Sequence, residues 1–557
     1  MNLNQYLTDA ESRYDAQCQM LGAQFHGPGY HSRMPEGTWT HATRESADYA
    51  IALLESGTDA NRQRACLVIA RILSLQERNS TAGTYGIWPW LLEESLAEMS
   101  PPDWNWADFI GTRLAQILIQ YGADLPDSLR HDIRIALGHA AWSIFRRNVQ
   151  SNYTNIAIMG ACVTVAAGEI LAVPQLVDYG RQRLANMVAY VQDQGNFNEY
   201  NSPTYTTVAI HETERILQLV HDSASRVAAE WIRNFAWQTT LAHFHPQTNQ
   251  WAPPHARAYH DHLPPETAAY LSTATGLRIP THDGGVAPMP WSPIKHLPAP
   301  ASALEQCRSR PATGIVLKER FIRREPEEDS SYATTWMTEK ACFGSMNRST
   351  FWTQHRSLQG YLWTPTDAAV VLRVRALHDG RDFCAISCRN MQEANRVLTV
   401  FNMSQNTGDY HPSLDRPPNG SFRVQDLRIR YVLSGKDVAV QRIGNETVTL
   451  TAGTWKIVIH ANREGSFGGR SIRWEIGEQK EQVWFDAVLY AGEPMDFVPE
   501  TAGPLILAAG LEILTPNESM ATQSPVVVYQ GDSAVEAHWL TNLRVVAPAD
   551  KKSVYKK

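Results

Sequence analysis

The feature that most constrains this chain is a change in the spacing of its apolar residues near residue 314. From about residue 42 to 243, apolar residues recur at the spacing of a helix face, as in residues 107–121. Beyond residue 314 they follow the alternation of strands rich in Val, Ile and aromatic residues, as in 368–375 and 482–490. The helical spacing and the strand alternation belong to different kinds of core, so this change in pattern predicts a helical half followed by a β half.

The breaks between these segments predict how the two halves are organised. Helical segments follow one another at intervals of roughly 20 to 25 residues, which favours helical hairpins stacked in a ring or solenoid. A proline-rich stretch that includes residues 288–300 separates them from the strands. We therefore expect a helical domain over residues 1–250, a connector that contributes to the cleft over 251–312, and an antiparallel β-sandwich over 313–557.

Composition excludes several classes of partner. At 43% hydrophobic and 19% charged residues the chain is typical of a globular protein, and we expect no stretch approaching the roughly 18 apolar residues of a membrane span. A net charge of −7 without a Lys/Arg run argues against nucleic acid. The seven cysteines are scattered, which favours buried thiols in a reducing compartment. No signal peptide is visible, so we expect a cytoplasmic protein, or a secreted or periplasmic one if the sequence is a processed form.

The segment from Gly195 to Arg215 carries the strongest chemical signal. Ser202 followed by Pro203 is typical of a helix start, with the serine as N-cap and the proline at the first helical position. Tyr205 then lies in the first turn, where free amide N–H groups and the helix dipole favour an anion. We expect this position to help the Tyr205 phenol ionise and act as a base.

Two further polar groups fall at helix ends or in loops, where a cleft is usually built. Residues 151–156 open another helix and place Asn152 and Asn155 at its N-terminus. Residues 255–262 of the connector gather a cation, a phenol and imidazoles, which include Arg257, Tyr259 and His260. A guanidinium matches a carboxylate in shape, so Arg257 is the candidate cation.

Tryptophans supply candidate sugar-stacking surfaces. Trp88 and Trp90 lie in one segment and Trp106 in another, and exposed indole faces commonly stack on sugar rings. Tryptophans wedged between helices would give the same pattern, and both alternatives stay open.

The pair Asn152-Tyr153 and the run from Gly195 to Tyr205, Gly-x-Phe-x-Glu-x-x-Ser-Pro-x-Tyr, resemble the heparinase II/III and alginate lyase-like polysaccharide lyases. The resemblance implies an incomplete (α/α) toroid followed by antiparallel β-sheets. It also implies that Asn152 binds a uronate carboxylate, that Tyr205 takes the C5 proton and returns a proton to the leaving O4, and that a histidine of the β half, His355, reaches into the cleft. Tyr153 stands where some relatives carry histidine.

The expected activity is therefore β-elimination on a uronic-acid-containing polysaccharide or oligosaccharide. We expect Tyr205, Asn152, Arg257, His355 and Tyr259 to act in catalysis. The expected substrate contacts are those of Glu199, Tyr200, Tyr153, His260, Trp88, Trp90 and Trp106.

Three other functions stay open. A glycoside hydrolase would use Glu199 with Asp103 or Asp261, a uronate C5-epimerase would share the proton abstraction, and a non-catalytic carbohydrate-binding protein would need only the aromatic surface. The proposed chemistry requires no cofactor, and the sequence leaves open a structural calcium or zinc in the β half. It also leaves open the uronic acid, endo or exo action, and a homodimer.

Overall fold

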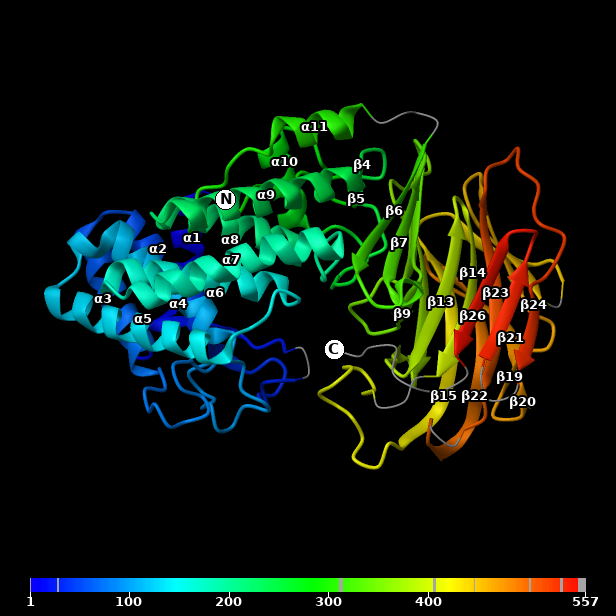
Figure 1. The fold of residues 1–557 in the computed structure, drawn as a ribbon, viewed down its shortest axis with the longest axis horizontal. Coiled ribbons are helices and arrows are strands. Elements are labelled where there is room, and N and C mark those ends of the chain that lie inside the picture. Colours follow the sequence, from blue (N-terminus) through cyan, green and yellow to red (C-terminus); the bar gives the residue numbers. More distant parts are fainter. Residues whose placement is uncertain are drawn as a thin grey trace.

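The computed structural model describes residues 2–27, 30–309, 314–403, 407–444, 446–499, 502–530 and 534–548. Helices make up the N-terminal part and sheets the C-terminal part, on opposite sides of the molecule (Figure 1). The predicted order of helices and then strands is confirmed. The helices are α1 (Leu3–Glu11), α2 (Thr43–Glu55), α3 (Asp59–Ser74), α4 (Trp106–Tyr121), α5 (Asp127–Arg147), α6 (Thr154–Leu171), α7 (Pro174–Gln194), α8 (Tyr205–Leu219), α9 (Ser223–His243), α10 (Pro265–Thr275) and α11 (Ala301–Arg308).

The helices from α2 to α9 form hairpins that stack on one another. Each even-numbered helix packs against the odd-numbered helix that follows it, as α2 does with α3 and α6 with α7. The even-numbered helices also contact one another in order, and so do the odd-numbered ones. The result is two rows of helices with an apolar core between them, which is the stacked-hairpin arrangement that the helical spacing predicts.

Helix α6 is the most apolar helix of the core. Its 18 residues have a mean hydropathy of 1.6, so by length and composition it passes the test for a membrane span, which the sequence expectation overlooked. In the structure, 83% of that segment is buried inside the protein, between the neighbouring helices. It is therefore packed as the central helix of the hairpin stack.

Two large antiparallel sheets form the β half and share one apolar core, to which β11, β22, β14 and β18 all contribute. The first contains β6 (Ile315–Ile322), β7 (Ser331–Met337), β8 (Ala341–Met346), β10 (Leu358–Leu362), β11 (Val370–His378), β12 (Arg381–Asp382), β15 (Phe422–Ser434), β21 (Arg473–Gln479) and β22 (Gln482–Phe497). The second contains β9 (Arg348–Thr350), β13 (Ile386–Glu393), β14 (Arg396–Met403), β16 (Val438–Arg442), β17 (Thr447–Ala452), β18 (Trp455–Ala461), β19 (Ser466–Phe467), β20 (Arg470–Ser471) and β23 (Leu505–Leu514).

Smaller sheets complete the fold. The strands β24 (Val526–Gln530), β25 (Ala534–Trp539) and β26 (Leu543–Pro548) form a sheet that packs on β14. In the helical half, one sheet contains β1 (Tyr14–Asp15), β2 (Met20–Gln24) and β3 (Trp39–His41), and a second contains β4 (Phe244–His245) and β5 (Gln250–Trp251). The expected connector also contains α10 and α11, so it has more regular structure than its prolines indicate.

Two glycines allow the halves to meet closely. Gly195 ends α7 at a φ of +99°, and a Cβ there would lie 2.7 Å from the Arg320 carbonyl oxygen on β6. Gly344 on β8 lies under the connector, where a Cβ would stand 2.0 Å from the Pro253 carbonyl oxygen. Only glycine fits such approaches, so these positions hold the end of α7 and the connector against the first sheet.

Candidate active site

The segment from Gly195 to Tyr205 runs from the end of α7 to the start of α8. Helix α8 begins at Tyr205, and the Ser202 hydroxyl accepts a hydrogen bond from the Tyr205 backbone N–H at 2.9 Å. The same hydroxyl donates to the Arg257 carbonyl oxygen at 2.6 Å. The Ser202 hydroxyl makes the hydrogen bond expected of a cap, but α8 begins two residues later than expected, because Thr204 and not Ser202 directly precedes its first residue. Ser202 also ties the start of α8 to the connector.

The Arg257 guanidinium joins three distant parts of the chain. It donates to the Tyr205 hydroxyl at 2.9 Å, to a Glu199 carboxylate oxygen at 3.1 Å and to the Gln354 side-chain oxygen at 2.6 Å. It also lies over the rings of Tyr205 and Trp352, at 4.5 and 4.8 Å from their centroids. Helical half, connector and β half thus meet at one cation.

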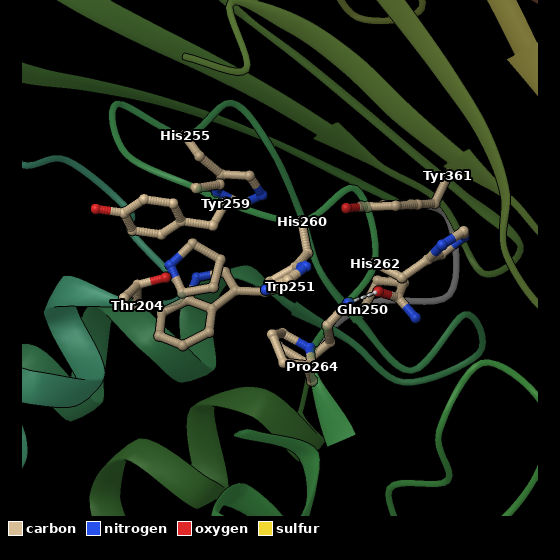
Figure 2. Close-up of a pocket in the computed structure, with 12 residues that line it drawn as sticks. Thr204, Gln250, Trp251, His255, Tyr259, His260, His262, Pro264 and Tyr361 are labelled. Carbon is tan, nitrogen blue, oxygen red and sulfur yellow. Dashed lines mark hydrogen bonds between the residues drawn. The ribbon is translucent and has the colours of Figure 1, made fainter. Parts of the chain in front are cut away.

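Tyr259 links this cation to solvent. Its hydroxyl lies 2.6 Å from the Tyr205 hydroxyl, and its side chain is 45% exposed. Figure 2 shows the Tyr259 hydroxyl directed away from His262 and Tyr361. Below, the Tyr205 cluster means Tyr205, Glu199, Arg257, Tyr259 and Gln354.

The electrostatics of Tyr205 differ from the expectation. Burial raises the pKa of Tyr205 well above its ordinary value, Arg257 acts to lower it, and Tyr259 and Glu199 raise it further. The expected easy ionisation at a helix start is wrong, because a helix terminus contributes only about 0.3–1 kcal/mol and burial outweighs it. The phenol is therefore protonated at neutral pH.

Glu199 orients Arg257. One carboxylate oxygen accepts from the guanidinium and the other accepts from the Asn155 backbone N–H at 3.5 Å, at the start of α6. Burial raises the pKa of Glu199, and Arg257 and the α6 backbone act to lower it. Since Glu199 is 5% exposed and both oxygens have partners, its position suits holding the guanidinium better than touching a substrate.

Asn152 and Tyr153 lie just before α6. The Asn152 side chain is exposed, and its backbone carbonyl accepts from the Asn198 side chain at 3.2 Å. The Tyr153 hydroxyl accepts from the Asn105 side chain at 3.1 Å. Burial raises the pKa of Tyr153 to about 12, Glu199 raises it too, and Arg257 lowers it. Tyr153 is therefore close enough to Glu199 and Arg257 for their charges to act on its pKa.

His355 lies beside Trp352, with 5.3 Å between the ring centroids. Its ring is 7% exposed, and its Nδ1 lies 3.1 Å from the Thr350 carbonyl oxygen. Burial lowers the pKa of His355 to about 4, so the imidazole is neutral. The neighbouring Gln354 and Trp352 contact Arg257, and neither was expected from the sequence. Their only sequence signal is that they share a segment with His355.

Two expected substrate contacts are corrected by burial. Tyr200 is 1% exposed, and its hydroxyl donates to Glu319 at 2.6 Å and lies 3.1 Å from His243 Nε2. Trp88 is fully buried, and its indole N–H donates to the Ile72 carbonyl oxygen at 2.9 Å. Neither ring has a face to offer a sugar, because the first fills the junction with β6 and the second fills the helical core.

The other two tryptophans belong to an aromatic row that joins both halves. Neighbouring rings lie 5.0 to 5.4 Å apart, centroid to centroid. The aromatic row consists of Trp352, His411, Tyr30, His31, Trp90 and Trp106. The loop that carries His411, yellow in Figure 1, extends from the β half toward the blue N-terminal segment. Tyr30, His31 and His411 could not be expected from the sequence, since no local pattern relates residues so far apart in the chain.

His260 is exposed and lines a small cavity with Trp251 and Thr204 (Figure 2). The volume of this cavity is about 10 Å³, roughly the room for one water molecule, so it cannot hold a sugar ring. His262 also lines this cavity, and its Nε2 lies at hydrogen-bond distance, 2.8 Å, from the Ala369 carbonyl oxygen. Tyr259 also lines this cavity, so the cavity lies directly beside the Tyr205 cluster.

The carboxyl groups considered for a hydrolase are engaged elsewhere. Asp261 pairs with Arg356 at 2.9 Å and with Arg373 at 3.1 Å. Burial acts to raise the pKa of Asp261, but the two arginines outweigh it and hold the pKa at about 2. Asp103 accepts from the Trp90 indole at 3.2 Å and from the Asn105 backbone. Among the described residues, the Tyr205 cluster contains no group of three metal-ligating side chains.

Comparisons with known proteins add little to this geometry. The family described as "Domain of unknown function (DUF8769)" matches residues 11–277, just under half of the chain. No curated protein matches. Among solved structures, "Crystal Structure of Heparinase III" is similar at 10% identity and a TM-score of 0.38, covering 91% of this chain and 82% of that one. At this level of similarity the match carries no argument about chemistry.

Proposed function

We propose that this chain is a polysaccharide lyase that cleaves a uronic-acid-containing glycan by β-elimination, on an incomplete (α/α) toroid. In this proposal Tyr205 serves as base and then acid, and Arg257 neutralises the substrate carboxylate. The observation that carries it is the contact of 2.9 Å between the Arg257 guanidinium and the Tyr205 hydroxyl. A phenol and a guanidinium held together are the two groups that this reaction needs.

The chemistry explains the need for both. A proton on the carbon next to a carboxylate is very weakly acidic, so donors aimed at the carboxylate must stabilise the enolate-like intermediate. A guanidinium has five N–H groups, and three of those on Arg257 have partners within the described residues. The other two are suited to a substrate carboxylate. The exposed Asn152 amide is the second donor in this proposal.

The bonds change as follows. The Tyr205 phenolate takes the C5 proton, and the C5–H electron pair forms the C4=C5 double bond while the bond from C4 to its glycosidic oxygen breaks. The leaving oxygen then receives the proton from Tyr205. The products are an unsaturated uronate and a new free hydroxyl, and Tyr205 returns to the phenolate state.

Tyr205 must lose its proton before the first turnover. The Tyr259 hydroxyl is 2.6 Å from it and belongs to an exposed side chain, which provides a path for the proton to solvent. Arg257 stabilises the anion that is left. Arg257 beside the substrate carboxylate stabilises the negative charge that develops when C5 loses its proton, so the C5 proton becomes acidic enough to move to the Tyr205 phenolate.

The aromatic row is the proposed binding surface for the sugar units that flank the cleaved bond. Trp90, Trp106 and Tyr30 are half-buried, which leaves part of each ring accessible. Rings of this kind stack on the apolar faces of sugars. The expected partner is thus an acidic polysaccharide or oligosaccharide.

The hydrolase alternative has weaker support. A hydrolase needs one carboxyl group that stays protonated as an acid and a second that acts as base or nucleophile. Glu199 is bound by Arg257, and the pKa of Asp261 is held at about 2. The epimerase alternative shares every residue of the proposal and is separated from it only by the product.

The test is the ultraviolet absorbance of the unsaturated uronate, followed while the protein is incubated with a panel of polyuronates and uronate-containing glycosaminoglycans. We expect the absorbance to rise on at least one of them. Release of reducing ends without this absorbance would overturn the proposal in favour of a hydrolase. Exchange of the C5 proton with deuterated solvent, without cleavage, would identify an epimerase, and binding without any reaction would identify a carbohydrate-binding protein.

A further inference from the structure

A second group of polar side chains lies in the small N-terminal sheet, remote in sequence from the Tyr205 cluster. Asp15 ends β1, Cys18 lies in the turn to β2, and His41 ends β3. The strands are neighbours in the order β1-β2-β3, which brings the three residues together. One ligand atom from each, a carboxylate oxygen, a sulfur and an imidazole nitrogen, lies within 4.8 Å of the other two.

The His41 imidazole is the member of the group that indicates a ligand. His41 is 5% exposed, and its Nε2 is a buried nitrogen that has no hydrogen-bond partner among the described residues. It faces Asp15, whose Oδ2 lies 3.5 Å away. A buried polar atom without a partner is unfavourable by roughly 1–3 kcal/mol, so an atom directed into such a cluster points to a missing ligand.

The opposite side of the ring is held as metal-binding histidines usually are. His41 Nδ1 lies 2.5 Å from one oxygen of Glu93, and the other oxygen of Glu93 accepts from the His41 backbone N–H at 3.0 Å. When a carboxylate accepts a hydrogen bond from Nδ1–H, the Nε2 lone pair is free to bind a metal.

We propose that Asp15, Cys18 and His41 bind a zinc ion. Zinc bonds of about 2.0 Å to nitrogen or oxygen and 2.3 Å to sulfur place tetrahedral ligand atoms about 3.3–3.5 Å apart. The separation of 3.5 Å between His41 and Asp15 already fits, and Cys18 is in a turn where a small shift closes the set. Thiolate with imidazole selects zinc over calcium or magnesium, and the partly exposed side of the group leaves a fourth position for water.

The position of the group gives the ion a structural role. The His41 carbonyl accepts from the Leu92 backbone N–H at 2.9 Å, and Glu93 is bound to His41, so the strand end is tied to the segment that carries Trp90. Zinc would join the turn between β1 and β2 to that same segment. The ion would thereby fix one end of the aromatic row without taking part in proton transfer.

Cobalt titration of the full-length, metal-free protein tests the site. Co²⁺ replaces zinc and reports a cysteine ligand by a thiolate charge-transfer band and a tetrahedral site by intense visible bands. We expect both bands to saturate at one ion per chain and to disappear when zinc is added. Failure to bind Co²⁺ or Zn²⁺ at micromolar concentration would overturn the proposal.

Variants assign the ligands. We expect Cys18→Ser to lose the thiolate band and His41→Gln to lose binding. Cys66 is a half-buried cysteine on α3, and we expect Cys66→Ser to keep both the band and the binding. Glu93→Gln should weaken binding by about 10–100-fold, as carboxylates behind metal-bound histidines do. Asp15→Asn keeps an oxygen for the Gln17 and Cys18 backbone N–H groups and so tests the charge without undoing the turn. A thiolate band that persists in Cys18→Ser would refute the assignment.

Discussion

Tyr200 and Tyr205 lie in the same short segment, yet their surroundings differ in almost every respect. The Tyr200 hydroxyl is fully buried and donates to Glu319, with His243 on its other side. The Tyr205 hydroxyl receives a hydrogen bond from Arg257 and faces Tyr259, whose side chain reaches solvent. One tyrosine is fixed between an acid and an imidazole, and the other lies between a cation and a phenol.

The charge of the partner decides what each phenol can do. Burial raises the pKa of Tyr200 well above its ordinary value, and Glu319 raises it again, so the phenol remains a donor. Burial raises the pKa of Tyr205 as well, but there Arg257 acts in the opposite direction. The two tyrosines therefore differ in the sign of the neighbouring charge: Arg257 opposes the effect of burial on the pKa of Tyr205 without cancelling it, whereas Glu319 adds to that effect at Tyr200.

The largest expected effect comes from removing the two hydroxyls separately. Tyr205→Phe should lower kcat on the cleaved glycan by about 10²–10⁴-fold, because general acid–base transfer by a positioned group contributes on that scale. Tyr200→Phe should leave kcat within about twofold, because its hydroxyl contacts no part of the Tyr205 cluster. Initial rates of unsaturated product formation measure both.

Tyr121→Phe is the matched control, since that ring lies at the far end of α4, about 22 Å along the helix from Trp106 at a rise of 1.5 Å per residue. Equal losses of activity in Tyr200→Phe and Tyr205→Phe would remove the distinction between the two tyrosines.

The next effect concerns the cation. Arg257→Lys keeps a positive charge but loses the planar group that contacts Tyr205, Glu199 and Gln354 together, so kcat/KM should fall by about 100-fold. Arg181→Lys is the control, because Arg181 on α7 makes a comparable forked contact with Asp222, which directly precedes α9. Undiminished activity in Arg257→Lys would show that Arg257 does not bind the carboxylate.

A third effect is a shift along the pH axis. Because the pKa of Tyr205 is raised, the ionised fraction is small at neutral pH, and log kcat/KM should rise by about one per pH unit from pH 7 to 9. Tyr259 is among the groups that raise this pKa, so Tyr259→Phe should move the profile to lower pH by about one unit, the worth of one hydrogen bond. A profile that moves to higher pH would contradict this assignment.

The smallest effect is on stability. Tyr200→Phe leaves Glu319 and His243 without their shared phenol in a buried junction, and we expect the free energy of unfolding to fall by about 1–3 kcal/mol. Urea denaturation measures it, with Tyr205→Phe as the comparison that should lose less, since its neighbour Tyr259 reaches water. A larger loss of unfolding free energy in Tyr205→Phe would contradict this prediction and would indicate that the Tyr205 cluster mainly stabilises the fold.

Much of the fold follows from local rules. The helical spacing and the strand alternation predict the two halves, and Ser202 followed by Pro203 predicts that α8 starts near Tyr205. The candidate site was only partly predictable. Arg257 and Tyr205 meet as their chemistry suggested, but Gln354 and Tyr30 come from segments that share no pattern with them, and Trp88 proved to be core.

The sequence by itself determined the order of helices and strands and the position of Tyr205 at a helix start, because periodicity and capping act over a few residues. Only the tertiary structure decided that the pKa of this tyrosine is raised, that Arg257 opposes the rise and that Tyr200 is closed off. The reason is physical: burial and charge depend on groups that are distant in the chain, and these can outweigh the field of one helix end.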